Sequence, residues 1–308
     1  SCFGSDYLNY PDAVRILFLG ENIFPNFNFY DYAIGFHNIH FDDRYIRFPL
    51  YWLYQSDCLE ALAKGKTPCQ QDDLLNREFC GLVTSHVCNL RDGLFNAVMQ
   101  YKHVSSGGPW LNNIGGTIGK TVGDKRNWQR KFKFSLCSEN SITNGYVTEK
   151  ILQGFSAHTV PIYLGTSSVV KDFNPKAFVN VSDFANYEEA IQHIAEIDQN
   201  DNLYLSMLAE PAFAEGNTKE KAENELIQFL SSIFEQNKQD AFRRNPDREW
   251  GVDLDIHNQE RCLMIRQKYW RLKHLENTIL QKEFNTNIYD QGVKQRIFNL
   301  LASFLMAK

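Results

Sequence analysis

Short apolar runs that end in glycine or a small polar residue recur along this 308-residue chain, and segments with helical periodicity follow several of them. The runs are residues 14–20, 32–36, 79–85, 132–137, 160–165 and 178–181. Such runs are typical of strands that are buried on both faces of a parallel sheet. Helices are predicted over residues 90–100, 148–157 and 182–191. The alternation therefore predicts a doubly wound α/β fold, in which ligands bind at the carboxyl ends of the strands.

Charge and cysteine content restrict the classes of partner and compartment. The formal net charge of −5 argues against nucleic acid as a partner, so a nucleotide phosphate would have to meet a local cationic site. No apolar run reaches the roughly 18 residues of a membrane-spanning helix. The seven cysteines are odd in number and form no C-x-x-C pair. This predicts reduced thiols in a cytoplasmic protein rather than a disulfide framework or a zinc ribbon.

We expect three parts, covering residues 1–74, 75–240 and 241–308. The polar, turn-rich stretch 54–76 is interpreted as a linker between the first two. Residues 260–282 of the tail form a predicted helix with six basic and two acidic residues outside its apolar positions. Such a helix can lie on an anionic membrane surface, or it can be an ordinary helix with a solvated charged face.

The segment from Asn140 to Lys150 is the strongest candidate for a ligand-binding site. It follows a predicted strand and opens a helix, where free backbone N–H groups can receive a diphosphate. Lys150 offers a cation for that diphosphate, and Glu149 can accept hydrogen bonds from ribose hydroxyls. Composition alone would also allow a surface turn at this place.

Several ordered motifs together resemble the α-1,3-fucosyltransferases of glycosyltransferase family 10, and the bacterial members in particular. The first is Phe134-Ser135-Leu136-Cys137-Ser138-Glu139-Asn140 followed by residues 145–150, and the similarity continues through residues 158–165 and 171–176. Earlier stretches are residues 20–22, 25–28, 31–36 and 43–50. The resemblance covers roughly residues 10–210.

The resemblance implies a GT-B architecture, with two Rossmann-like domains facing a cleft, and here a C-terminal helical tail. Residues 1–74 would be the acceptor-side domain and residues 75–240 the GDP-fucose-binding domain. The implied reaction is the inverting transfer of L-fucose from GDP-fucose to the GlcNAc of Galβ1-4GlcNAc-type glycans, which gives a Lewis x-type product. By motif, Glu21 corresponds to the general base, and the donor-binding residues are Arg91, Asn140, Tyr146, Glu149 and Lys150. No metal is expected to be essential, and a divalent metal would at most stimulate.

The residue types suit these roles. A carboxylate such as Glu21 can remove the acceptor proton as attack proceeds, and guanidinium binds phosphate bidentately, which suits Arg91 to the departing GDP. Each position also has a plainer interpretation. Glu21 could be a loop carboxylate that caps backbone N–H groups, Arg91 a solvated helix charge, and Tyr146 part of the core.

Other expectations concern the ends of the chain and the alternatives to the main hypothesis. Asp253-Leu254-Asp255 matches the D-x-D metal motif of other glycosyltransferases, but it lies in the tail and is interpreted as a chance match. Only about twenty residues precede Glu21, so the first domain is expected to lack its first strands and helices. A cytoplasmic protein with peripheral contact to the inner membrane is expected, and a homodimer is left open. The alternatives are a transferase that uses another nucleotide sugar and a non-catalytic glycan- or nucleotide-binding protein.

Overall fold

The computed structural model describes residues 6–64, 71–119 and 121–244, with three further positions in the tail. Those three positions, Met264, Lys268 and Arg271, are helical and exposed. The rest of the predicted tail helix and the Asp253–Asp255 motif lie outside the described residues. Within the described ranges, no helix is both long enough and apolar enough to cross a membrane. The four described cysteines (Cys58, Cys80, Cys88 and Cys137) carry free thiols.

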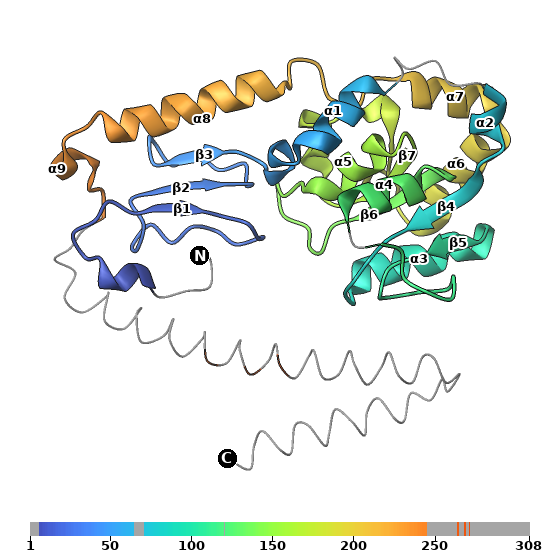
Figure 1. The fold of residues 1–308 in the computed structure, drawn as a ribbon, viewed down its shortest axis with the longest axis horizontal. Helices are drawn as coiled ribbons and strands as arrows, with labels where there is room; N and C mark the ends of the chain where they lie inside the picture. The colour runs from blue at the N-terminus through green and yellow to red at the C-terminus, as the bar shows by residue number, and fades with distance from the viewer. Residues whose placement is uncertain are drawn as a thin grey trace, which may run out of the picture. The chain divides into compact units, whose positions relative to one another are not determined.

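The first sheet has three parallel strands, β1 (Ile16–Phe18), β2 (Tyr32–Gly35) and β3 (Tyr45–Arg47), in that spatial order. A later helix, α8 (Lys219–Phe234), runs alongside this sheet (Figure 1). Tyr32 meets Phe229 of α8 edge to face, with their ring centroids 6.1 Å apart. The chain therefore returns to its first sheet after it has built the second.

The second sheet has five parallel strands in the order β5-β4-β6-β7-β8. They are β4 (Glu78–Leu82), β5 (Val104–Ser106), β6 (Phe132–Ser138), β7 (Val160–Leu164) and β8 (Val179–Asn180). The chain steps outward from β4 to β5 and then returns to the other side of β4, so the direction of winding reverses between β4 and β6. Open α/β sheets bind ligands outside the strand ends at such a switch point. The mixed α/β fold with parallel sheets is as the sequence predicts.

Helices cover both faces of the second sheet (Figure 1). One hydrophobic cluster joins Leu136 and Ile162 to buried residues of α3 (Asn89–Tyr101), α6 (Tyr187–Gln199) and α7 (Asp201–Ala209). Another joins their neighbours Cys137 and Tyr163 to α5 (Glu149–Ser156) and α1 (Gln55–Ala63). Successive strand residues thus enter opposite cores, which explains why these strands are apolar throughout.

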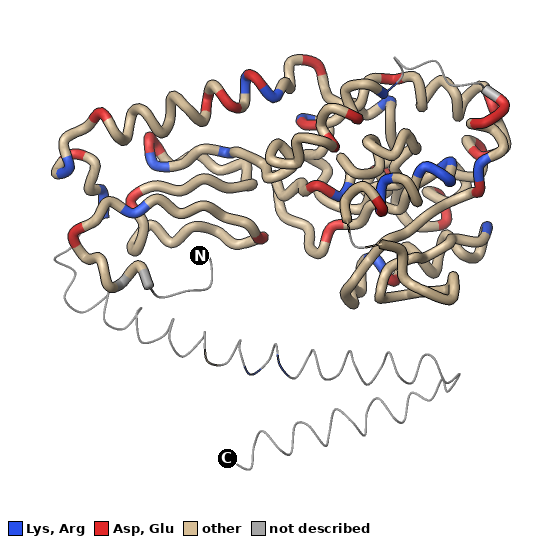
Figure 2. Tube along the Cα trace, viewed as in Figure 1, with Lys and Arg blue, Asp and Glu red and all other residues tan. Residues whose placement is uncertain are grey.

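The shorter elements complete the described chain. They are α2 (Gln71–Leu75), α4 (Val122–Gln129), α9 (Lys238–Ala241) and the 3-10 turns η1 (Asp6–Asn9), η2 (Leu50–Leu53), η3 (Ser167–Lys171), η4 (Pro175–Ala177) and η5 (Val181–Asp183). Basic and acidic positions are interspersed along the chain (Figure 2).

Two local predictions were wrong. The predicted linker 54–76 contains α1 and α2, and α1 buries Asp57, Cys58 and Ala61 while Leu59 and Leu62 stay exposed. The helix predicted from residue 182 begins at Tyr187 instead, where the Asn186 side chain accepts a 3.0 Å hydrogen bond from the Glu189 N–H. Asparagine is a strong helix N-cap, and it outweighs the earlier Ser182-Asp183 signal.

The two sheets are joined through Arg47, the last residue of β3. Its guanidinium donates to both carboxylate oxygens of Asp172, at 2.8 and 2.7 Å, and the Asp172 side chain is buried. The same guanidinium donates to the Phe36 carbonyl at 2.6 Å and to the Gly145 carbonyl at 3.0 Å. Gly145 has a φ of +91°, and a Cβ there would lie 2.4 Å from the Asn38 nitrogen. Only glycine allows this approach.

We expect Gly145→Ala to lower the free energy of unfolding by about 2–4 kcal/mol, because the new Cβ meets backbone as well as an unfavourable φ. Gly115 is a matched control, since its φ is +79° but a Cβ would meet nothing within 4 Å. Gly115→Ala should cost only about 1 kcal/mol. Urea denaturation followed by tryptophan fluorescence measures both. Equal losses would show that the close approach at Gly145 is not a constraint.

Candidate active site

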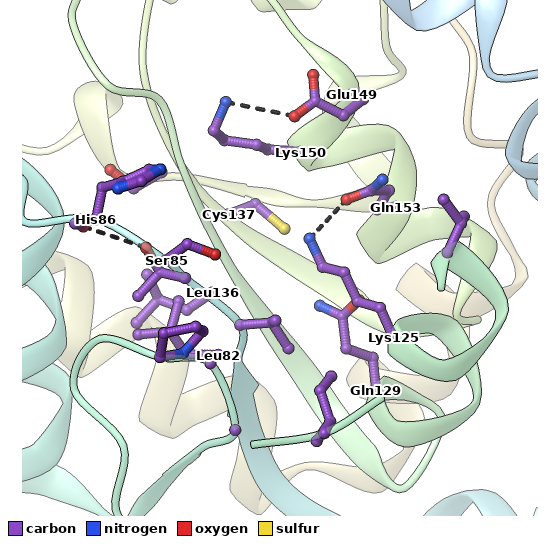
Figure 3. Close-up of a pocket in the computed structure, with 18 of the residues that line it drawn as sticks. Leu82, Ser85, His86, Lys125, Gln129, Leu136, Cys137, Glu149, Lys150 and Gln153 are labelled. Carbon is purple, nitrogen blue, oxygen red and sulfur yellow. Dashed lines mark hydrogen bonds and ion pairs between the residues drawn. The ribbon is translucent and has the colours of Figure 1, made fainter. Parts of the chain in front are cut away.

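A pocket of about 670 Å³ opens at the switch point of the second sheet. It is lined by the segments that follow β4, β5 and β6 and by the facing sides of α4 and α5. Pockets of this size accommodate ligands such as a nucleoside diphosphate. Figure 3 shows the side chains of these elements converging on one space.

Arg91 lies in the first turn of α3 and is only 4% exposed, so it is not a solvated helix charge. It donates to the Thr84 hydroxyl at 2.6 Å and to the Asn140 side-chain oxygen at 2.7 Å. It also donates to the carbonyls of His86 at 3.2 Å and Ser138 at 3.1 Å. These contacts fix its cation between the ends of β4 and β6 and orient Asn140.

Lys150 lies in the first turn of α5, between two carboxylates. Its Nζ is 3.3 Å from Glu139 Oε2 and 3.6 Å from Glu149 Oε1, and it donates to the Thr148 hydroxyl at 3.0 Å. Burial alone would lower the pKa of Lys150, but the charges of Glu139 and Glu149 raise it above its ordinary value. Lys150 is therefore a cation at neutral pH. Lys150, Glu149, Asn140 and Arg91 all line the same pocket.

Glu139 was missed by sequence reasoning as a determinant of this site. Its carboxylate is fully buried and accepts from the Thr148 N–H and the Thr148 hydroxyl, both at 2.8 Å. Thr148, the first residue of the predicted helix, holds the N-cap position of α5, but its hydroxyl donates to Glu139 instead of capping the helix. A carboxylate placed directly after a fully buried strand was the available signal.

Tyr146 and Glu21 are not among the residues that line the pocket. Tyr146 is 3% exposed and packs edge to face against Phe36 at 5.0 Å. Burial raises the pKa of its phenol, and the charge of Glu21 contributes to the increase. Glu21 is exposed in the segment that follows β1. The structure thus brings four of the six predicted site residues into one pocket, and the other two do not line it.

Asn22 holds the segment of Glu21 against the loop that precedes α5. Its side-chain amide donates to the Ser141 hydroxyl at 2.6 Å and to the Thr143 hydroxyl at 2.9 Å. Its oxygen lies 2.8 Å from Nε2 of the buried His37. Ser141 and Thr143 stand between Asn140 and Tyr146, so Glu21 neighbours the loop that leads into α5.

The floor of the pocket contains a polar group that no motif indicated. Lys125 Nζ donates to the Gln153 side-chain oxygen at 2.6 Å, and burial lowers the pKa of Lys125. Cys137 lies beside them, and burial raises the pKa of its thiol to about 12. Gln129, one helical turn after Lys125 on α4, completes the group. Among the described residues, no three His, Cys, Asp or Glu side chains gather as metal ligands would.

The fold and the pocket define an α/β protein with two fixed cations at the switch point of a parallel sheet, an arrangement suited to a phosphorylated ligand. Comparison with family models is in agreement. The model for the C-terminal part of glycosyltransferase family 10 (fucosyltransferase) matches residues 79–238. The model for the N-terminal domain of alpha-(1,3)-fucosyltransferase FucT matches residues 1–54.

Individual relatives point the same way. The alpha-(1,3)-fucosyltransferase FucT of Helicobacter pylori is 40% identical over 233 residues, which cover 66% of this chain and 48% of that protein. The murine 4-galactosyl-N-acetylglucosaminide 3-alpha-L-fucosyltransferase 9 is 36% identical over 100 residues, or 31% of this chain and 28% of that protein. The chain spans about half the length, or less, of these curated relatives.

Comparison with solved structures shows that the fold is also similar. A crystal structure of an alpha1,3-fucosyltransferase superimposes with a TM-score of 0.66 and 34% identity, covering 79% of this chain and 78% of that one. A structure of an alpha1,3-fucosyltransferase with GDP-fucose gives a TM-score of 0.63 at the same identity, covering 73% of this chain and 76% of that one. The chain belongs to glycosyltransferase family 10, the fucosyltransferases.

We expect Glu139→Gln to lower the free energy of unfolding by about 3 kcal/mol, because it removes one partner of a buried ion pair. Glu149→Gln is the control, since Glu149 is partly exposed, and should cost about 1 kcal/mol or less. The pKa of Lys150 is higher in the folded state than its ordinary value of 10.5. The ion pair with Glu139 therefore contributes fully to the free energy of unfolding below pH 10.5, and this contribution is lost as the pH rises from there through the raised pKa. Urea denaturation at pH 8 and above pH 10.5 should show that the difference in free energy of unfolding between the wild type and Glu139→Gln becomes smaller at the higher pH. A difference that does not change with pH would contradict an ion pair between Glu139 and Lys150.

Proposed function

We propose that this chain is the catalytic part of an inverting α-1,3-fucosyltransferase with a GT-B arrangement. It would transfer L-fucose from GDP-fucose to the GlcNAc of Galβ1-4GlcNAc-type glycans. The observation that carries the proposal is the pocket in which Arg91 and Lys150 face the switch point, in a chain of this family. The relatives named for GDP-fucose binding and for a galactosyl-N-acetylglucosaminide acceptor support the choice of substrates.

The chemistry follows from charge. In a single in-line displacement, the acceptor oxygen bonds to the anomeric carbon of fucose while the bond from that carbon to the GDP β-phosphate oxygen breaks. The departing GDP gains negative charge, which Arg91 and Lys150 stabilise. Asn140, Glu149 and Tyr146 are proposed to complete the donor site, with Glu149 accepting from ribose hydroxyls. The configuration inverts because the attack comes from the face opposite the leaving group.

Glu21 is proposed as the general base that takes the acceptor proton. It is exposed, it follows β1, and its neighbour Asn22 is bonded to the loop between Asn140 and Tyr146. These contacts support the proposal that a base following β1 acts on a donor bound at the second sheet. No metal is assigned an essential role, because the cations of the pocket are side chains. Membrane contact through the tail stays a prediction, since that segment lies outside the described residues.

The direct test is a donor and acceptor screen. We expect turnover with GDP-fucose and N-acetyllactosamine, an α-1,3 linkage in the product by NMR, and continued turnover in excess EDTA. Transfer from other GDP- or UDP-sugars with none from GDP-fucose would indicate a different donor. Nucleotide binding without any transfer would indicate a binding protein, and complete loss in EDTA that metal restores would overturn the metal-free mechanism.

Replacing the base separates chemistry from binding. Glu21→Gln should lower kcat for transfer by about 10²–10⁴-fold, because an amide cannot accept the proton. GDP affinity measured by calorimetry should stay unchanged, since Glu21 does not line the pocket. Glu196→Gln, an exposed carboxylate on α6, is the matched control and should leave both quantities unchanged. Transfer that persists in Glu21→Gln would exclude Glu21 as the base.

A further inference from the structure

The segment that follows β1 holds an aromatic ring in the open. Phe24 is 56% exposed, and its ring stacks on the imidazole of His37 with ring centroids 4.0 Å apart and an angle of 20° between the planes. His37 is fully buried and covers one face of the Phe24 ring. The exposed area of Phe24 therefore lies on its opposite face and its rim. A flat apolar surface is thus presented to solvent three residues after Glu21, the proposed base.

Hydrogen bonds fix the imidazole beneath this ring. His37 Nε2 lies 2.8 Å from the side-chain oxygen of Asn22, and the amide nitrogen of Asn22 donates to two hydroxyls of the loop that precedes α5. The amide oxygen is therefore the acceptor, and Nε2 of His37 carries the proton. Burial lowers the pKa of His37, so the imidazole is neutral at neutral pH. Phe24 accordingly rests on a neutral ring whose orientation is set.

The position of this ring pair is that of a ligand site in an α/β fold. Phe24 follows β1 and His37 follows β2, and open parallel sheets bind ligands beyond the carboxyl ends of their strands. Asn38, the residue after His37, donates from its backbone N–H to the Asn144 carbonyl at 3.2 Å and from its side chain to Asn144 Oδ1 at 2.9 Å. The pair therefore borders the loop that leads into α5. Three residues of chain span at most about 11 Å, so the Cα atoms of Phe24 and Glu21 lie no further apart than that.

The exposed face of Phe24 suits a sugar ring. A single exposed apolar side chain needs no explanation by itself, but this one is stacked on a buried ring and adjacent to the proposed base. It offers neither a charge nor a hydrogen bond, and it is not among the residues that line the donor pocket. The electron-rich face of an aromatic ring attracts the positively polarised C–H bonds of a sugar. In galactose the axial 4-hydroxyl leaves one ring face with a run of adjacent C–H bonds, so this face is apolar.

We propose that the open face of Phe24 binds the galactose ring of the acceptor and thereby selects Galβ1-4GlcNAc-type glycans. This inference rests on the proposed function, because it takes fucose transfer to the GlcNAc of such a glycan as the reaction. The reacting 3-hydroxyl of GlcNAc must meet Glu21, and the galactose is attached to the neighbouring 4-oxygen. A ring held this close to the base is placed to receive the galactose. Phe24 contacts no reacting atom, so it is a specificity-determining residue and not a catalytic one.

Steady-state kinetics with GDP-fucose and N-acetyllactosamine test the inference. Phe24→Ala should raise the KM for N-acetyllactosamine by about tenfold, because an aromatic face and the apolar area it covers are lost. The kcat and the KM for GDP-fucose should stay unchanged, since Phe24 does not line the donor pocket. Phe24→Trp keeps an aromatic face and should retain most of the acceptor affinity. Phe41→Ala is the matched control and should change none of these quantities, since Phe41 is 42% exposed and also stacks on a ring, that of Phe27.

The monosaccharide N-acetylglucosamine, which has no galactose, distinguishes galactose binding from a general effect. If Phe24 binds galactose, the wild type has a higher KM for the monosaccharide than for N-acetyllactosamine, and Phe24→Ala leaves the monosaccharide KM unchanged. An unchanged KM for N-acetyllactosamine in Phe24→Ala, an equal increase for both acceptors, or an equal increase in Phe41→Ala would overturn the inference and leave the proposed function standing. A wild-type chain that transfers no fucose to N-acetyllactosamine would overturn both. Melting temperatures within a few degrees of wild type establish that each variant is folded.

Discussion

The bidentate pair between Arg47 and Asp172 is the contact on which the relation of the two sheets depends. Desolvating two charges offsets much of their attraction, so such a pair contributes more to a fixed geometry than to net stability. Here the guanidinium is also shared with the carbonyls of Phe36 and Gly145, one from each side. A planar fork with five donors can satisfy all of these acceptors at once, which lysine could not do. The loop that ends at Gly145 thereby stays in contact with the first sheet.

Arg91 and Lys150 are held in the pocket in different ways. The four acceptors around Arg91 are all neutral, namely a hydroxyl, an amide oxygen and two carbonyls. Lys150 instead lies against two carboxylates, which keep it protonated but cancel much of its field. Of these two cations, Arg91 therefore carries more of the uncompensated positive potential, and a diphosphate would relieve the cost of burying it. The negative net charge of the whole chain gives no indication of this local positive potential.

The sequence was most informative where one physical requirement dominates. The strands of the second sheet are buried on both faces, so β6 and β7 could be located from composition alone, and the strand-to-helix junction at Asn140–Lys150 followed. Helix α1 was missed because only its Asp57, Cys58 and Ala61 side is buried, and its remaining surface resembles a linker. Glu139 was not assigned although its partners Thr148 and Lys150 lie in the same segment, because its carboxylate, placed directly after a buried strand, was not interpreted as buried. Gln129 belongs to no motif. The catalytic roles of Glu21 and the donor residues stay predictions.

Helix α8 has a consequence for how the protein is made. Its Leu226, Phe229 and Leu230 share a hydrophobic cluster with Ile16, Ile34 and Ile46 of the first sheet. On the ribosome those strands emerge some two hundred residues before their cover, and the whole second sheet is synthesised in between. The apolar surface of the first sheet that α8 covers therefore stays exposed until α8 has been synthesised. Early termination would leave that surface open, so chaperone demand should concentrate on this half of the protein.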